Sequence, residues 1–323
     1  MARKKANYPL IEGLEITTLA AEGKAMGRWN DVVVFVPMTV PGDVVDVQIR
    51  LKRRRFMEGY VVRYVERSPL RTEPFCAHFG VCGGCKWQNL PYDEQLRQKT
   101  AQVRDQLARI GKIELPEIAP CLGSAETQFY RNKLEFTFAD RRWLTQEEVA
   151  SGAPLDAAPA AGFHIPGMFD KVLDIDRCWL QPEPSNEIRL FVKRFCLDRG
   201  YAFHNAREHR GLMRNMIVRT ASTGEVMVVV VFGADDRERI AALLDALAER
   251  FPSVTSLFYV VNEKMNDSVG DLEPVLWRGK DHIMEQMEGL RFKVGPKSFY
   301  QTNSGQAYEL YKVARDFADL KPG

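Results

Sequence analysis

Three cysteines in one short stretch have a spacing that could ligate a metal centre. Cys76, Cys82 and Cys85 follow a C-x5-C-x2-C pattern, and a fourth cysteine, Cys178, lies far along the chain. Four thiolates can hold either an iron–sulfur cluster or a structural zinc ion. Zinc sites usually pair two short C-x2-C segments, whereas three ligands and a distant fourth resemble the split pattern of [4Fe–4S] clusters. We therefore expect a cluster here, with zinc or purely structural cysteines as alternatives.

The glycines and the remaining cysteines support this interpretation. Gly83 and Gly84 separate two of the candidate ligands, and we expect them to allow a sharp turn. Cys196 lies in a helical pattern among phenylalanines, which is typical of a small buried hydrophobic residue. Neither Cys121 nor Cys196 lies in a motif suited to a catalytic nucleophile.

A second pattern with chemical potential lies nearer the N-terminus. The run Lys52–Arg55 is followed at once by Phe56, and Tyr60 comes shortly after. Cations for phosphates beside rings for bases are what a single-stranded RNA surface requires. The alternative is a solvated hairpin tip, which is the common outcome for so short a charged run.

Composition restricts the class of protein. The 323 residues are 45% hydrophobic and 27% charged, as in an ordinary globular protein with room for two or three domains. No apolar run is long enough for a membrane span, and no signal peptide is visible. Six cysteines in a chain of this length favour reduced thiols and a cytoplasmic location. The basic excess is N-terminal, because residues 1–67 carry twelve Lys and Arg against eight Asp and Glu.

The elements that must position these residues follow from periodicity and turn signals. Short segments rich in β-branched residues between positions 8 and 67 predict a small closed barrel of four or five strands. A helix is expected from Pro91 to Ile110, and residues 140–161 are expected to form a flexible surface loop. Further strands are expected at 129–139, 162–175, 213–221 and 226–232, and helices at 186–199 and 235–251. A polar and aromatic turn at 298–303 leads into a last helix.

Four of these features together resemble the RumA-like RNA uridine-5-methyltransferases. They are the N-terminal barrel, the four cysteines, Tyr130-Arg131 at the start of the central sheet, and Ser298-Phe-Tyr-Gln-Thr-Asn303. The barrel resembles a TRAM domain, which is an RNA-binding module similar to the oligonucleotide-binding fold. The resemblance extends over essentially all of the chain.

The resemblance implies cofactors and site residues. The cysteine set implies a [4Fe–4S] cluster on Cys76, Cys82, Cys85 and Cys178, and the turn implies S-adenosylmethionine contacted by Gln301. Phe299 corresponds to an aromatic residue of the target-base pocket, and Arg131 to a contact for the flipped nucleotide. Together with Lys52, Arg53, Arg54, Arg55 and Phe56, these two residues form the expected RNA-binding set.

The same resemblance gives an expected fold class and domain division. The class is α+β multidomain, with a Rossmann-like methyltransferase domain missing after residue 323, because no glycine-rich cofactor motif appears before that point. The expected divisions are a barrel at 1–67, a cluster loop at 68–90, a helix at 91–120 that packs on the methyltransferase domain, a central α+β domain at 121–294, and the start of the methyltransferase domain at 295–323. No catalytic residue is assigned in this chain. The nucleophilic cysteine and the base are expected beyond Gly323, and this chain alone is expected to be inactive.

The function expected from this resemblance is methylation of uridine C5 in RNA through a covalent cysteine–C6 adduct. The expected partner is 23S rRNA, with no membrane association and a monomeric state. One alternative is a non-catalytic iron–sulfur RNA-binding protein. Another is a radical tRNA methylthiotransferase, against which the spacing argues because those enzymes use C-x3-C-x2-C and leave one iron open.

Overall fold

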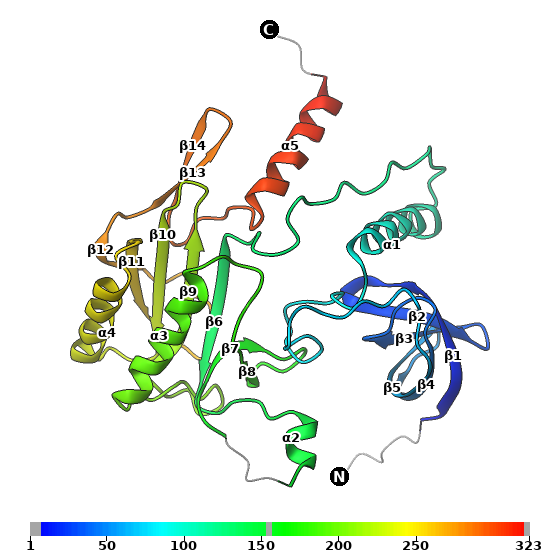
Figure 1. The fold of residues 1–323 in the computed structure, drawn as a ribbon, viewed down its shortest axis with the longest axis horizontal. Helices are drawn as coiled ribbons and strands as arrows, with labels where there is room; N and C mark the ends of the chain where they lie inside the picture. The colour runs from blue at the N-terminus through cyan, green and yellow to red at the C-terminus, as the bar shows by residue number, and fades with distance from the viewer. Residues whose placement is uncertain (1–7, 153–156, 320–323) are drawn as a thin grey trace. The chain divides into compact units, whose positions relative to one another are not determined.

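The computed structural model describes residues 8–152 and 157–319 and divides the chain into two compact units (Figure 1). The first unit comprises residues 1–80 and 84–123, and the second comprises 81–83 and 124–323. The cysteine stretch therefore crosses between units twice. Part of the expected loop at 140–161, residues 153–156, lies outside the described residues.

The first unit is built on a closed five-stranded barrel with the strand order β1-β2-β3-β5-β4. Most neighbouring strands are antiparallel, and the parallel pair β3–β5 completes the ring. The strands are β1 (Leu10–Leu19), β2 (Lys24–Trp29), β3 (Val32–Pro37), β4 (Val44–Lys52) and β5 (Phe56–Glu66), with the short 3-10 turn η1 (Ala21–Gly23) after β1. The sequence did not single out β2, which has no β-branched residue. It contains Gly27, where an added Cβ would lie 2.2 Å from the Glu15 carbonyl oxygen of the neighbouring strand.

Alternating hydrophobic side chains of these strands fill the barrel. Ile16, Val34, Val45 and Val47 are completely buried there, as the period of two in a strand requires. Leu90, beyond the cysteine stretch, is buried in the same core. The segment after the cysteines is thereby attached to the barrel.

The helix expected from Pro91 is present but has little cover. It consists of α1 (Tyr92–Asp105) and a π-helical turn, η2 (Gln106–Ile110). Among its side chains only Glu94 is buried, and Ile110 is 79% exposed. Its expected packing on a methyltransferase domain stays a prediction.

The second unit is organised around a seven-stranded sheet of order β12-β11-β10-β9-β6-β7-β8 (Figure 1). Only β10 and β11 are parallel, and the helix α4 (Arg237–Arg250) connects them as a crossover. The strands are β6 (Lys133–Ala139), β7 (Ala160–His164), β8 (Val172–Asp174), β9 (Met213–Thr220), β10 (Val226–Phe232), β11 (Val254–Val261) and β12 (Val275–Gly279). The single strand expected at 162–175 is instead the hairpin β7–β8, because Pro166 and Gly167, with φ of 77°, turn the chain between them.

Both faces of this sheet are covered. Helices α3 (Ser185–Asp198) and α4 (Arg237–Arg250) pack on one face, where Val192, Cys196 and Leu244 join the main core. On the other face, the hairpin of β13 (Ile283–Met287) and β14 (Leu290–Val294) contributes to a smaller core. Cys196 is fully buried, which confirms the expected packing role.

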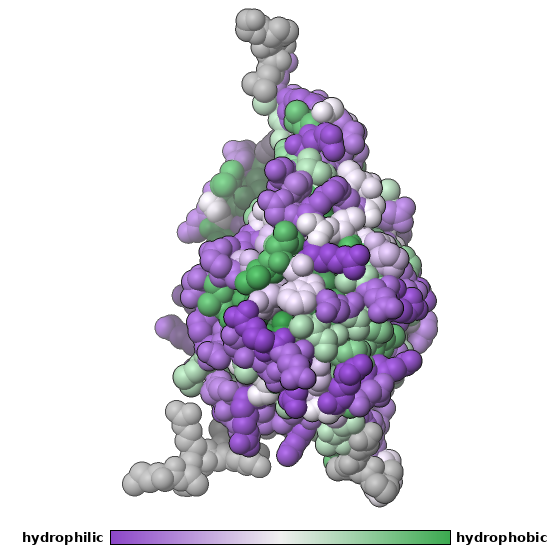
Figure 2. Space-filling view, turned by 90° about the vertical axis from the view of Figure 1, so that its left-hand side faces the viewer, coloured by the Kyte–Doolittle hydropathy of each residue, from purple (hydrophilic) through white to green (hydrophobic). Residues whose placement is uncertain are grey.

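Two further helices, one short and one long, complete the unit. Residues 140–161 contain α2 (Gln146–Ala150), whose N-terminus Thr145 and Glu148 close as a capping box. The last helix, α5 (Ser304–Ala318), is capped at its N-terminus by Asn303, whose side chain accepts a hydrogen bond from the Gln306 backbone N–H. On the face shown in Figure 2, hydrophilic residues surround smaller hydrophobic areas. None of the described helices combines the length and apolar character needed to cross a membrane.

Candidate functional site

The basic run lies at the tip of the β4–β5 hairpin. Residues 52–55 are exposed, and the Arg53 backbone N–H donates to the Phe56 carbonyl across the turn at 2.8 Å. The Phe56 ring packs edge-on against Phe35, with centroids 5.8 Å apart. This is a hairpin tip, as the alternative interpretation expected. It also presents four adjacent cations, so both interpretations remain compatible with the fold.

The four cysteines are divided between the units. Cys76 and Cys85 belong to the first unit, and Cys82 and Cys178 to the second. In the second unit, Cys178 is buried and Cys82 is partly buried against the same core. The backbone N–H and C=O of Cys178 are both bonded to the Asn186 side-chain amide, at 2.7 and 3.1 Å.

The expected role of the glycines is partly corrected. Neither Gly83 nor Gly84 has a positive φ, whereas Gly80 does, at 92°. Gly83 is needed for a different reason, because an added Cβ would lie 2.5 Å from the His164 carbonyl oxygen. Its N–H donates to that same oxygen at 3.1 Å. Gly83 therefore attaches the cysteine stretch to β7.

These residues do not form a recognisable metal site. Across residues 8–152 and 157–319, no group of three or more His, Cys, Asp or Glu side chains is placed to hold a metal ion. The structure does not support the four-cysteine ligand set, and the cluster stays a prediction.

Two sequence motifs, Tyr130-Arg131 and the turn 298–303, lie close together in the second unit. Asn132, directly after Arg131, donates from its side-chain amide to the Gln301 carbonyl and to the Ser304 hydroxyl, both at 2.8 Å. Its backbone N–H donates to the Thr302 carbonyl, also at 2.8 Å. The start of β6 therefore holds the 298–303 turn directly.

Two buried charged residues, Arg219 and Glu285, form hydrogen bonds with the 298–303 turn and with Ser304 directly after it. The Arg219 guanidinium donates to the Ser298 carbonyl at 2.7 Å, and the Glu285 carboxylate accepts from the Ser304 hydroxyl at 3.2 Å. Within the described part of the chain, three buried polar atoms here have no hydrogen-bond partner: Asn132 Oδ1, Arg219 Nε and the Tyr300 hydroxyl. The 298–303 turn is therefore surrounded by buried polar atoms that could still accept or donate a hydrogen bond.

The segment before Asn132 forms a second contact, with the chain around Cys178. The backbone N–H groups of Phe129 and Arg131 donate to the carbonyls of Trp179 and Leu180 at 2.8 and 2.7 Å. The Arg177 guanidinium lies 4.3 Å from the Trp179 ring centroid and 5.7 Å from that of Phe129. Aromatic faces and a stacked cation therefore lie beside Arg131.

Three cations, Arg131, Lys133 and Arg219, lie close together in this region, and the buried Glu285 carboxylate lies beside the turn. Burial, and then repulsion from Arg219, lower the pKa of Lys133, and Arg131 adds to the effect. Lowered amine pKa values of this kind show several cations sharing a partly desolvated space. Such a region favours an anionic ligand. We refer to Arg131, Asn132, Lys133, Arg219 and the turn 298–303 as the β6 site.

The residues predicted in this region have different exposures. Phe299 is 85% exposed, and the Gln301 side chain is also exposed. Arg131 is half-buried, with Nε 3.5 Å from the Lys133 carbonyl. Sequence reasoning missed Asn132 and Arg219. A polar residue directly after Tyr130-Arg131 was a signal for the first, and nothing in the local sequence marked the second.

The barrel defines the general class of protein. A family model of the TRAM domain matches residues 11–62, which are nearly the whole five-stranded barrel. The chain is thus a TRAM-domain protein with a second, mixed α/β unit.

Comparison with known proteins gives the family. The chain is 57% identical over 305 residues to an uncharacterized RNA methyltransferase of Bacteroides thetaiotaomicron, covering 94% of this chain and 67% of that protein. A second such protein, of Porphyromonas gingivalis, is 55% identical, with 95% and 67% covered. This chain belongs to the RNA methyltransferase family. It spans about two thirds of the length of these relatives.

A solved structure has the same fold. The Pyrococcus abyssi tRNA (uracil-54, C5)-methyltransferase, in complex with S-adenosyl-L-homocysteine, superposes with a TM-score of 0.66 at 26% identity. The match covers 96% of this chain and 65% of that one.

One expectation about the fold class is wrong. We expected a Rossmann-like methyltransferase domain to be missing after residue 323, and therefore an inactive chain. The solved methyltransferase matches 96% of this chain and the Bacteroides relative matches 94%, which gives no support for a missing domain. The expectation relied on the absence of a glycine-rich motif, and an absent motif does not locate a domain boundary. The expected inactivity has no support either.

Proposed function

We propose that this protein takes part in S-adenosylmethionine-dependent methylation of uridine C5 in RNA, with the β6 site close to the reacting groups. The observation that carries the proposal is the direct hydrogen bonding of Asn132 to the turn that contains Gln301. Two supports are independent of this geometry. The chain belongs to the RNA methyltransferase family, and the similar solved enzyme is a tRNA uracil C5-methyltransferase in complex with S-adenosyl-L-homocysteine.

The chemistry explains why such residues are needed. Uracil C5 is a poor nucleophile, so a cysteine thiolate first adds to C6 and makes C5 nucleophilic. C5 then takes the methyl group that S-adenosylmethionine supplies on a sulfonium. A base removes the C5 proton, and the thiolate leaves C6.

In this scheme the residues of the β6 site bind and orient. The target base must leave its stack, which costs about a few kcal/mol. The exposed ring of Phe299 offers a surface on which the extruded base can stack. The cations Arg131, Lys133 and Arg219 attract the negative charges of the nucleotide, and Gln301 contacts the cofactor.

Neither leftover cysteine suits the nucleophilic role. Burial raises the pKa of the Cys196 thiol to about 12, so its reactive thiolate is scarce at neutral pH. Cys121 is exposed, and its backbone N–H donates to the Thr100 hydroxyl of α1, in the unit that does not contain the β6 site. We assign the nucleophile to neither residue.

The RNA partner has two candidates. The sequence interpretation favoured 23S rRNA because the barrel and a cluster are typical of that branch. The similar solved enzyme acts on tRNA and matches 96% of this chain. A match of that length must include the barrel. The presence of a barrel therefore does not distinguish rRNA enzymes from tRNA enzymes. We propose 23S rRNA and keep tRNA as the second candidate.

One experiment tests both the reaction and the RNA. The protein is incubated with S-adenosylmethionine labelled in the methyl group and with unmodified 23S rRNA or tRNA transcripts, and the RNA is digested to nucleosides. Label in 5-methyluridine from the rRNA supports the proposal. Label only from tRNA changes the substrate, label in another nucleoside refutes the reaction, and no label in any nucleoside refutes catalysis by the residues of this chain.

A further inference from the structure

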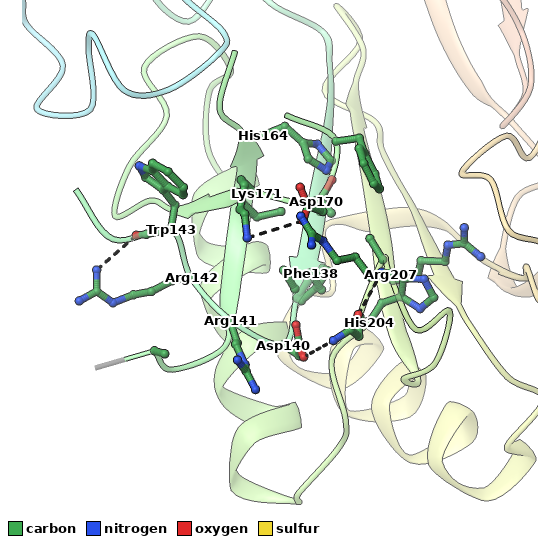
Figure 3. Close-up of a pocket in the computed structure, with 18 of the residues that line it drawn as sticks. Phe138, Asp140, Arg141, Arg142, Trp143, His164, Asp170, Lys171, His204 and Arg207 are labelled. Atoms are coloured by element: carbon green, nitrogen blue, oxygen red, sulfur yellow. Dashed lines mark hydrogen bonds and ion pairs between the residues drawn. The ribbon is translucent and has the colours of Figure 1, made fainter. Parts of the chain in front are cut away.

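The second unit contains a cavity that the β6 site does not use. It lies at the end of β6 opposite to Asn132, and its volume is about 600 Å³, within the usual range of ligand pockets. Its walls come from β6, β7–β8 and the segment around residues 204–208 (Figure 3). Because β6 has seven residues, the two ends of the strand are roughly 20 Å apart.

The rim of the cavity carries cations that exceed their counter-charge. The Asp170 carboxylate is shared by Arg207, which is hydrogen-bonded to it, and by Lys171, whose amine is 3.6 Å away. Figure 3 shows these three side chains converging on one side of the cavity. The two cations lower the pKa of Asp170, with the Arg207 hydrogen bond as the largest cause. Among all the residues that line the cavity, five Lys and Arg stand against four Asp and Glu, an excess of one positive charge.

Aromatic rings lie beside this charge. Phe169 lines the cavity while 71% of its surface is exposed, which is unusual for a residue of this size. Trp143 also lines it, and its backbone N–H is held by the Val172 carbonyl at 2.7 Å. Rings next to a cation are the arrangement that binds a base with its phosphate.

The floor of the cavity provides a polar group that needs a partner. Asn215, on β9, is only 4% exposed and lines the cavity. Its amide nitrogen donates to the Thr137 hydroxyl at 3.3 Å, but its carbonyl oxygen has no hydrogen-bond partner among the described residues. A buried acceptor costs free energy unless a donor reaches it, and a base edge carries suitable N–H groups.

The walls are held in place before any ligand arrives. The Asn205 side-chain amide donates to Asp140 at 2.8 Å and accepts from the backbone N–H groups of Arg207 and Glu208 at 3.0 and 2.9 Å. Arg142 pairs with Glu148 at 2.8 Å. This pre-organisation favours binding because little ordering is required.

We propose that this cavity binds one unpaired nucleotide of the RNA, separate from the target uridine. The base stacks on Phe169 and reaches Asn215, and the phosphate contacts Lys171 and Arg207. The inference rests on the proposed function, since it takes the ligand from an RNA strand. The same chemistry would fit a free mononucleotide, so the experiment separates the two sources.

The test measures binding of a fluorescein-labelled single-stranded oligouridylate of about 12 nucleotides by anisotropy, over a series of salt concentrations. Lys171→Gln keeps the Asp170–Arg207 pair and removes one cation. It should lower the slope of log affinity against log salt by about 0.7, the value for one single-strand phosphate contact. Lys280→Gln is the matched control, because Lys280 also pairs with one carboxylate, Glu225 at 2.6 Å, and does not line the cavity. It should leave the slope unchanged.

The stacking contact has its own pair of variants. Phe169→Ala should weaken oligouridylate binding at least about fivefold, and Phe169→Tyr, which keeps the ring, should restore it. Unchanged binding by both Lys171→Gln and Phe169→Ala overturns the proposal. The proposal is also overturned if uridine monophosphate binds the protein without displacing the oligouridylate. That result would favour a site for a free nucleotide. If the wild type binds no RNA, the proposed function fails as well. If the wild type binds RNA and only substitutions in the barrel weaken that binding, the cavity proposal fails and the proposed function stands.

Discussion

The side-chain amide of Asn132 donates a hydrogen bond of 2.8 Å to the Gln301 carbonyl, across 169 positions of the sequence. With a second bond from the same amide to Ser304 and a backbone bond to Thr302, one residue fixes the turn in which Gln301 and Phe299 lie. The rigidity of the proposed cofactor contact therefore depends on a residue that would not itself touch the cofactor. Asn132 is a positioning residue in this sense.

Replacing Asn132 should uncouple the turn from the sheet. Asn132→Ala removes two hydrogen bonds of about 1 kcal/mol each, so the free energy of unfolding should fall by roughly 1–2 kcal/mol. Affinity for S-adenosylmethionine, measured by calorimetry, should fall as well, because Gln301 loses the side-chain hydrogen bond to its carbonyl, while the backbone bond to Thr302 and the Arg219–Ser298 bond remain. Asn266→Ala is the control, since Asn266 is exposed and its side chain accepts only from the Ser268 backbone, at 3.1 Å. A loss of stability with unchanged cofactor affinity would show that the turn does not bind the cofactor.

The sequence predicted several elements whose own residues carry a clear pattern, but it missed β11, whose sequence VTSLFYVV is as apolar as that of β10. Strand β10 is a run of valines and was placed at its observed bounds, and α4 was recognised from the stripe of Ile240, Leu243 and Leu247. The β13–β14 hairpin was missed because four of the five residues of β14 are exposed, so it has no alternating pattern.

Contacts between distant segments could not be predicted. Both halves of the β6 site were singled out, Tyr130-Arg131 and the 298–303 turn, but only as separate features of one family. Their hydrogen bonds depend on how β6 is placed in the sheet, and no local pattern encodes that. The cavity at the other end of β6 could not be predicted for the same reason, since its lining comes from stretches that are widely separated in the sequence, from Thr137 to Asp267.

The barrel should lose stability in acid through Asp43. Burial alone would raise the pKa of this carboxyl, but the hydrogen bond from Arg71 and those from the Ser68 and Val40 backbones outweigh it and hold the pKa below the ordinary 3.8. Because the folded-state pKa is the lower one, the stabilisation is complete above about pH 4 and is lost as the pH falls through the folded-state value.

Substitution of Asp43 tests this. The Asp43–Arg71 pair is 2.6 Å apart, and Asp43 is completely buried. Asp43→Ala should cost about 3–5 kcal/mol, because it leaves the Arg71 charge without its partner. Denaturant unfolding followed between pH 7 and pH 3 should show a steeper acid loss in the wild type than in Asp43→Asn. Parallel pH profiles would rule out Asp43 as the source.

The basic hairpin tip should contribute sequence-independent affinity for RNA. Changing Lys52, Arg53, Arg54 and Arg55 to Gln should weaken binding and lower the salt slope by up to about 3, at roughly 0.7 for each phosphate contact. The effect on stability should be small, since these side chains are exposed. Arg104→Gln with Arg109→Gln, on the helical segment of the same unit, is the control for loss of charge. An unchanged salt slope would place the RNA surface elsewhere.

The cysteine prediction can be tested by elemental analysis. We propose that Cys76, Cys82, Cys85 and Cys178 ligate a [4Fe–4S] cluster, on the basis of the split spacing of these cysteines in the sequence. Anaerobically purified protein should then contain iron and acid-labile sulfide. Cys85→Ser should lower both, whereas Cys121→Ser, at an exposed cysteine outside the set, should lower neither. Zinc in place of iron would favour the structural-metal alternative, and equal iron contents in the two variants would remove Cys85 from the ligand set.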